Sequence, residues 1–215
     1  MKKLLVGVLL LYGFNCIAQD VQKPKKNYEY QDTRKKNETF AKLPPDIKAE
    51  LSTFTFSGID EGIKRLPLTK ISYSSLGNDF MRFEGNDIKA TITLSPFDAS
   101  KHKLDYDEGY LIKINKKTYY GGYSNVPKKY ISNITIVMGK DTVAIPPAAY
   151  ADLYNLNFAY LDKGTQRSVN GIYRSANPHR IYLYLFCKDN TGSYEVTWII
   201  YDKKYVRRVL DYGFM

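Results

Sequence analysis

Two consecutive apolar runs decide the fold: Arg180-Ile-Tyr-Leu-Tyr-Leu-Phe-Cys-Lys188 and Tyr194-Glu-Val-Thr-Trp-Ile-Ile-Tyr201, separated by an Asp-Asn-Thr-Gly turn at 189–192. Tyrosine, branched aliphatic and other aromatic residues favour extended chain, and each run has the length of a strand. A turn sequence rich in Asn and Gly between two such runs is typical of antiparallel pairing. The sequence therefore predicts two antiparallel strands here.

The second run alternates between two sets of side chains, as a strand requires. One face carries Val196, Trp198 and Ile200, and the other carries Glu195, Thr197 and Ile199. A further turn at Asp202-Lys203 leads into another strand-like segment, 205–211. The C-terminal part of the chain is thus predicted to be an antiparallel meander.

The same period of two recurs upstream. Within 88–95, Ile88, Ala90, Ile92 and Leu94 alternate with polar residues, which indicates a half-buried strand. Turn residues separate the other predicted strands, which are 70–75, 79–84, 110–115, 118–121, 130–138 and 142–145. Strands do not alternate with helices, so a parallel sheet is not expected. We predict a mostly β protein, an antiparallel β-sandwich with a few short helices, and a closed barrel as the second choice.

Short helices are expected in two regions, 46–66 and 146–153. Pro44-Pro45 precedes a helix over 47–51 that Asp46 can cap, and a second helical turn is predicted over 59–66. Pro146-Pro147 can begin one or two helical turns over 146–153. The segment 154–170 that follows is predicted to be an irregular connection.

The N-terminus has the features of a secretory signal peptide, assigned to residues 1–18. Lys2 and Lys3 precede an apolar run, 4–14, which is too short to span a bilayer. Small residues then favour cleavage after Ala18. The alternative is a lipid anchor on Cys16, although Asn15 before it is not the small residue that such processing prefers. The chain is therefore expected to be exported from a bacterial cell, to the periplasm or beyond, without a transmembrane span in its mature form.

The remaining chain is divided in two. Residues 19–45 are polar and rich in Lys, Asn and Gln, which predicts a flexible leader. Residues 46–215 have the length of a single β-rich domain. Only Cys187 lies beyond the predicted cleavage site, so no internal disulfide is possible and a packed, inert thiol is expected.

The chain is basic, with a formal net charge of +10, but its charges are scattered as pairs and triplets. A solvated basic surface explains this pattern, and export makes nucleic acid an unlikely partner. Anionic surfaces and acidic glycans remain compatible with such a charge.

Residues that commonly carry catalysis or bind metals are few. The two histidines, His102 and His179, have no second ligand at metal-binding spacing, and no Gly-x-Ser-x-Gly nucleophile motif occurs. Asp105, Asp107 and Glu108 cluster, but without the spacing of a calcium loop, so a solvated hairpin loop is expected. No metal, cofactor or catalytic residue is predicted.

The most suggestive binding segment is Tyr119-Tyr-Gly-Gly-Tyr-Ser-Asn125. The rings of Tyr119, Tyr120 and Tyr123 on a glycine-containing loop would be able to stack on sugar rings, while Ser and Asn hydrogen-bond to hydroxyl groups. Core packing beside an ordinary turn explains the same residues. These three tyrosines are the predicted ligand-binding residues.

Part of the C-terminal third resembles a known group of sequences. Tyr194-Glu-Val-Thr-Trp-Ile-Ile-Tyr-Asp-Lys203 and Tyr205-Val-Arg-Arg-Val-Leu-Asp-Tyr-Gly-Phe214 are similar to the closing segment of a family of secreted bacterial proteins of unknown function, and Asp162-Lys-Gly-Thr-Gln-Arg167 belongs to the same likeness. The resemblance implies a secreted β-rich domain. It implies no activity, cofactor or functional residue.

These observations favour a non-enzymatic exported module that binds a partner protein or an envelope glycan. The alternative is a glycan-acting hydrolase whose carboxylates come from distant strands, and another is a structural component of the envelope. An enzyme would show ionisable groups converging in a pocket, whereas a glycan binder would show a groove with exposed aromatic rings.

Overall fold

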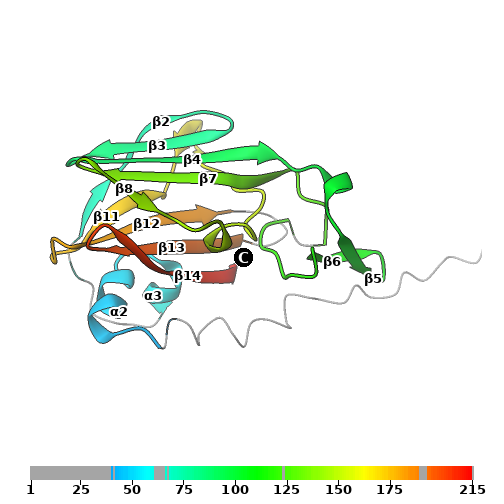
Figure 1. The fold of residues 1–215 in the computed structure, drawn as a ribbon, viewed down its shortest axis with the longest axis horizontal. Helices are drawn as coiled ribbons and strands as arrows, with labels where there is room; N and C mark the ends of the chain where they lie inside the picture. The colour runs from blue at the N-terminus through cyan, green and yellow to red at the C-terminus, as the bar shows by residue number, and fades with distance from the viewer. Residues whose placement is uncertain are drawn as a thin grey trace, which may run out of the picture.

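The computed structural model describes residues 40, 42–60, 66, 68–122, 124–188 and 193–214. The predicted signal peptide, Cys16 and most of the predicted leader lie outside these residues. The described chain forms two five-stranded antiparallel sheets that face each other (Figure 1). Helices lie beneath the lower sheet of that view, which contains β11 to β14. The predicted antiparallel β-sandwich is confirmed, with two separate open sheets in place of the closed alternative.

Each large sheet has its own strand order. Sheet A has the order β1-β11-β12-β13-β14, with the bounds β1 (Thr69–Ile71), β11 (Gly171–Arg174), β12 (Arg180–Cys187), β13 (Ser193–Tyr201) and β14 (Lys204–Phe214). Sheet B has the order β2-β3-β4-β7-β8, with the bounds β2 (Tyr73–Leu76), β3 (Phe80–Gly85), β4 (Ile88–Pro96), β7 (Lys129–Met138) and β8 (Asp141–Ala144). Two separate hairpins complete the strands: β5 (Leu104–Asp107) with β6 (Tyr110–Ile114), and β9 (Tyr160–Asp162) with β10 (Thr165–Arg167).

The main core lies between the two sheets. Val196, Trp198 and Ile200 of β13 belong to it, as their shared face predicts, and the same core contains Ile92 and Ile136 of sheet B. The indole Nε1 of Trp198 donates a hydrogen bond to the carbonyl oxygen of Ala149 at 2.9 Å, so the buried ring has its polar group satisfied. This cluster supplies the burial that holds the domain together in the absence of a disulfide.

The opposite face of sheet A is also buried, because the N-terminal helices cover it. The helix α2 (Pro45–Leu51) and the short helix α3 (Phe56–Asp60) lie on the side of sheet A that faces away from sheet B (Figure 1). Ile199 packs there in a second cluster with Leu51 and Phe40. β13 is therefore buried on both faces, which its alternating sequence did not indicate.

The helix predictions need two corrections. α2 begins at Pro45 with Pro44 as its N-cap and no side-chain capping bond, so the predicted cap by Asp46 is wrong. The carboxylate of Asp46 instead pairs with Arg180 at 2.8 Å. The second helical turn lies earlier than expected, at α3, and 61–65 fall outside the described residues. In the predicted segment 146–153, one helical turn forms, as predicted: the 3₁₀ helix η3 (Pro147–Ala149).

The predicted strand over 118–121 is wrong. Tyr120 makes only an isolated bridge with Leu153, and Gly121 and Gly122 have φ angles of 93° and 77°, which turn the chain out of an extended path. Conversely, the predicted irregular connection 154–170 contains the hairpin β9–β10.

The acidic cluster lies in a hairpin, and the cysteine is buried. Asp105 and Asp107 lie on β5, and Glu108 begins the turn into β6, so the expected hairpin forms with a shorter loop than expected. Cys187 is fully buried, and its Sγ lies 3.3 Å from the carbonyl oxygen of Asn155. The predicted packed thiol is confirmed.

Candidate functional site

Two adjoining hollows form an open groove at the surface. The larger has a volume of about 800 Å³ and the smaller about 360 Å³. They share the three residues Asn157, Phe158 and Ala159, so the segment 157–159 runs along both. We call the two hollows together the amide groove, because carboxamide side chains dominate its polar lining.

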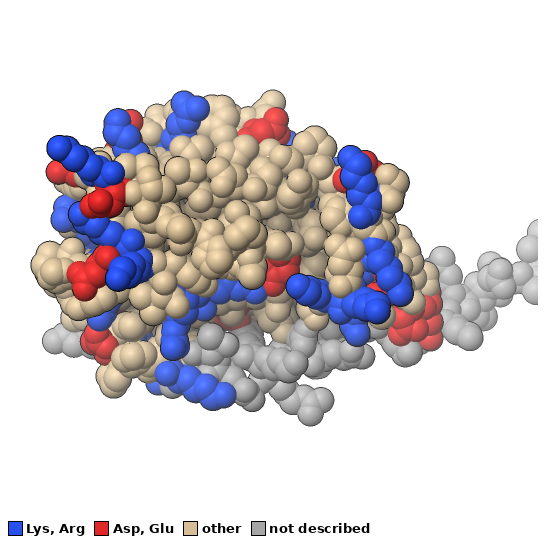
Figure 2. Space-filling model, viewed as in Figure 1, with Lys and Arg blue, Asp and Glu red and all other residues tan. Residues whose placement is uncertain are grey.

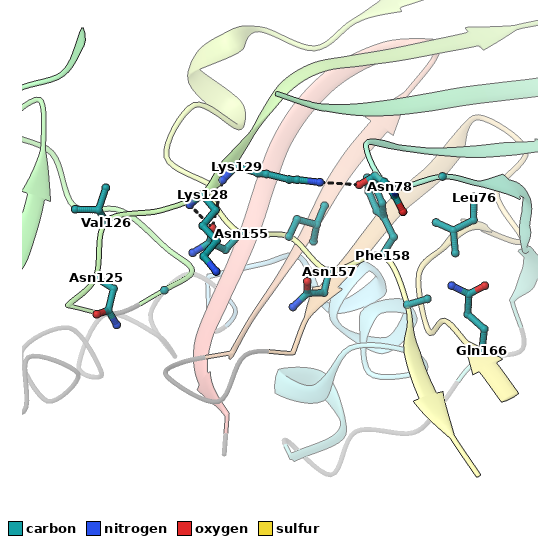
Figure 3. Close-up of a pocket in the computed structure, with 14 residues that line it drawn as sticks. Leu76, Asn78, Asn125, Val126, Lys128, Lys129, Asn155, Asn157, Phe158 and Gln166 are labelled. Atoms are coloured by element: carbon teal, nitrogen blue, oxygen red, sulfur yellow. Dashed lines mark hydrogen bonds between the residues drawn. The ribbon is translucent and has the colours of Figure 1, made fainter. Parts of the chain in front are cut away.

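The amide groove is assembled from loops that approach one another at one end of the sandwich (Figure 3). The larger hollow is lined by the β2–β3 turn, the loop before β7, the segment 155–159 and strand β10. Its carboxamide residues are Asn78, Asn125, Asn155, Asn157 and Gln166. Carboxamides donate and accept hydrogen bonds without a charge, which suits a ligand with both donors and acceptors.

Asn155 fixes the geometry of one wall. Its Oδ1 accepts hydrogen bonds from the backbone N–H of Lys128 at 2.8 Å and of Lys129 at 3.4 Å, which tie the loop before β7 to the segment 155–159 (Figure 3). Asn155 has a φ of 49°, a left-handed conformation that asparagine tolerates better than most residues. The side chain of Asn155 therefore fixes the shape of this wall, and its Oδ1 is engaged in these internal hydrogen bonds.

The segment 157–159 is held in place by hydrogen bonds to the backbone of Phe158. Phe158 is buried, and its carbonyl oxygen accepts hydrogen bonds from Ser168 Oγ at 2.7 Å and from Asn170 Nδ2 at 2.9 Å. The Oδ1 of Asn170 in turn accepts from the backbone N–H of Phe186 at 2.8 Å, which anchors the segment to β12. A groove floor fixed in this way needs little ordering when a ligand binds.

The hairpin β9–β10 lines both hollows and carries the exposed aromatic ring of the groove. Gln166 of β10 lines the larger hollow, and Tyr160 and Leu161 of β9 line the smaller. Tyr160 is 38% exposed and Leu161 is 77% exposed. The hairpin pairs with neither large sheet, so its side chains extend outside the main core.

The electrostatic character of the groove is positive. Lys128 and Lys129 line the larger hollow and Lys188 lines the smaller, and no Asp or Glu is among the described lining residues of either. Lys129 Nζ pairs with Asp79 at 2.6 Å and donates to the carbonyl oxygen of Asn78 at 3.1 Å. Elsewhere the charges are dispersed: on the face seen in Figure 2, Lys and Arg lie mainly toward its ends and lower edge.

The two predicted binding tyrosines that the structure describes, Tyr119 and Tyr120, do not form an exposed platform. Tyr119 is buried, with its hydroxyl 3.3 Å from each of the carbonyl oxygens of Leu111, Gly122 and Asn125, and burial raises its pKa to about 12. Tyr120 is half-buried against the ring of Tyr212, at a centroid distance of 5.2 Å. Tyr123 lies outside the described residues. The expectation that Tyr119 offers a stacking surface is corrected, because its ring packs in the core.

Neither histidine lies in the groove. The His102 ring stacks on Phe97 at 4.5 Å, and its Nδ1 is 2.9 Å from Asn115 Nδ2. His179 Nδ1 is hydrogen-bonded to a carboxylate oxygen of Asp202 at the β13–β14 turn. Within the described residues, no group of three His, Cys, Asp or Glu side chains is arranged to hold a metal ion.

Two buried carboxylates lie between the helices and sheet A, and neither lines the groove. Glu195 of β13 accepts hydrogen bonds from the backbone N–H groups of Phe56 and Ser57 and from the hydroxyl of Tyr184, each at 2.8 Å. Burial raises the pKa of Glu195, and these hydrogen bonds oppose the shift. Glu50 of α2 accepts from the hydroxyls of Ser175 and Tyr182 and pairs with Arg180. Both carboxylates attach the helices to sheet A.

Sequence reasoning missed the residues that make the groove. Tyr160, Asn157 and Gln166 all lie in the segment predicted to be an irregular connection. The available signal was the density of asparagine and aromatic residues in 154–160, Tyr-Asn-Leu-Asn-Phe-Ala-Tyr, which is unusual for a loop that only connects elements.

Fold and site together define a β-sandwich protein with an open, carboxamide-lined, positively charged groove at one end. Comparisons of this chain with protein-family models, with curated proteins and with solved structures yield no match. Among the described residues, no helix has the length and apolar character needed to span a membrane.

Proposed function

We propose that this protein is a non-enzymatic, exported module that binds an oligosaccharide in the amide groove. The observation that carries the proposal is the combination of carboxamides with the exposed ring of Tyr160 in two hollows that share the segment 157–159. Sugars present closely spaced hydroxyl groups, which amides bind as donors and acceptors, and apolar C–H faces, which pack on aromatic rings.

The lining favours binding over hydrolysis. Glycoside hydrolysis requires two carboxyl groups on either side of the scissile bond, and the described lining of the groove offers amides and lysines in their place. The buried carboxylates Glu50 and Glu195 serve the attachment of the helices. Export is part of the proposal and rests on residues 1–18, whose apolar run and small residues fit a cleaved signal peptide.

A glycan-array screen of the purified protein, followed by calorimetric titration of the best ligand, tests this function. Tyr160→Ala is expected to weaken binding about tenfold, because a lost aromatic contact costs about 1.4 kcal/mol. Gln166→Ala, at the other hollow, is expected to weaken binding severalfold. Both side chains are exposed, so neither variant should disturb folding.

Tyr201→Ala is the matched control, because Tyr201 is 39% exposed but lies at the opposite end of β13 from the groove. It should bind as the wild type does. If the wild type binds no glycan, or if Tyr160→Ala and Gln166→Ala bind as tightly as the wild type, the proposed function is wrong. In that case a partner protein or a structural role would take its place.

A further inference from the structure

We infer that the ligand of the amide groove is an acidic oligosaccharide, with anionic groups on at least two of its sugar units that contact Lys128 in one hollow and Lys188 in the other. The inference rests on the proposed function and specifies its ligand class. The anionic groups are carboxylates or sulfates, which present the same acceptor oxygens to an ammonium group.

The first support is the charge of the groove. Its described lining contains three lysines and no carboxylate. Lys129 is already neutralised by Asp79, at 2.6 Å. Within the described part of the chain, no carboxylate lies within ion-pairing distance of Lys128 or Lys188, so two ammonium groups remain for a ligand.

The second support is that the backbones of both lysines are fixed to the same short segment. Asn155 Oδ1 accepts the backbone N–H of Lys128 at 2.8 Å, and Asn157 Nδ2 donates to the carbonyl oxygen of Lys188 at 3.1 Å. Two asparagines, two residues apart, thus hold one lysine at each hollow. A ligand that follows the segment 157–159 from one hollow to the other meets both lysines.

The third support is the net positive charge of the whole protein, which attracts anions from a distance. The full chain has a formal net charge of +10, and removal of Lys2 and Lys3 with the predicted signal peptide leaves +8, so a polyanionic ligand is attracted before it reaches the groove. This attraction is general and screened by salt, whereas contacts with Lys128 and Lys188 are local. The experiment therefore has to separate the local contribution from the general one.

The probes are a galacturonic acid hexasaccharide and its fully methyl-esterified form, which have the same length and sugar but differ in charge, with a sulfated hexasaccharide as the third arm. We expect the acidic probes to bind at least tenfold more tightly than the ester in calorimetric titration at low salt. The preference should shrink as sodium chloride rises. Whichever acidic probe binds more tightly identifies the preferred anion.

The variants are Lys128→Gln with Lys188→Gln, and Lys140→Gln together with Lys204→Gln as the charge-matched control. Lys140 in the β7–β8 turn and Lys204 at the start of β14 are exposed at the opposite end of the sandwich. We expect the groove pair to lower the affinity for the acidic probe about tenfold without changing the affinity for the ester. The control pair, which removes the same charge, should lower it less than twofold.

The inference is overturned if the acidic and esterified probes bind equally, if the glycan array yields only neutral ligands, or if the control pair loses as much affinity as the groove pair. In each of these cases, glycan binding that depends on Tyr160 would leave the proposed function intact. If no glycan on the array binds, the proposed function and this inference fail together.

Discussion

Two tyrosine-containing segments of this protein differ in the burial of their rings. In the segment 119–122, Tyr119 is 5% exposed and belongs to a core cluster with Leu111 and Tyr154. In the segment 157–166, Tyr160 is 38% exposed and lines a groove. The residue type is the same, so the difference comes from what packs over each ring. Tyr119 is enclosed by β6 and by the segment near Tyr154, whereas Tyr160 lies on a hairpin outside both large sheets.

The backbone shows the same contrast. A Cβ atom at Gly121 would lie 2.1 Å from the carbonyl oxygen of Tyr154, so two parts of the chain approach there as closely as they can. A Cβ at Gly164, in the β9–β10 turn, would meet nothing within 4 Å. Tyrosine and glycine therefore accompany close packing in one segment and an exposed surface in the other. The contrast is testable through the free energy of unfolding of variants in the two segments.

The largest effect is expected for Tyr119→Ala, which should lower the free energy of unfolding by about 4 kcal/mol, because a buried ring leaves a cavity. Tyr119→Phe keeps the ring and should lose about 1 kcal/mol with the hydroxyl contacts. Urea denaturation measures both. A Tyr119→Ala protein as stable as the wild type would show that the ring is not packed in the core.

Gly121→Ala is expected to cost about 3 kcal/mol, because it combines a φ of 93° with a clash against Tyr154. Gly164→Ala has a similar φ, 79°, but open space around it, and should cost about 1 kcal/mol. The difference between the two thermal midpoints isolates the close approach from the backbone strain. Equal losses would mean that the approach of 121 to 154 does not constrain the fold.

The smallest effect is expected for Leu161→Ser in the hairpin β9–β10. Leu161 is 77% exposed, so its loss should change the free energy of unfolding by less than about 0.5 kcal/mol. Leu156→Ser, in the same connection but buried, is the contrasting variant and should cost several times more. Comparable losses in both variants would place the hairpin within the cooperative core.

The sequence predicted the strands of both sheets better than the loops between them. The alternation in 88–95 and the apolar runs around Trp198 specify paired extended chain, and the structure has β4, β12, β13 and β14 there. The groove was not predictable in this way. Tyr119 and Tyr160 have similar local sequences, rich in tyrosine, asparagine and glycine. Neither local sequence indicates which of the two rings another segment of the chain will cover.

Some features follow from the amino-acid sequence alone: a β-rich domain without an internal disulfide, a basic charge, an expected export signal and the inward face of β13. Composition fixes the charge and the single cysteine of the domain, and residues 1–18 carry the expected export signal. The period of the side chains fixes the strands and their inward face, because it depends only on neighbours along the chain. Only the tertiary structure decided that helices bury the second face of β13, that Tyr119 belongs to a core, and that Asn157, Lys128 and Gln166 line one groove. Such contacts join residues distant in sequence, and they arise from the way the sheets, helices and loops close over one another.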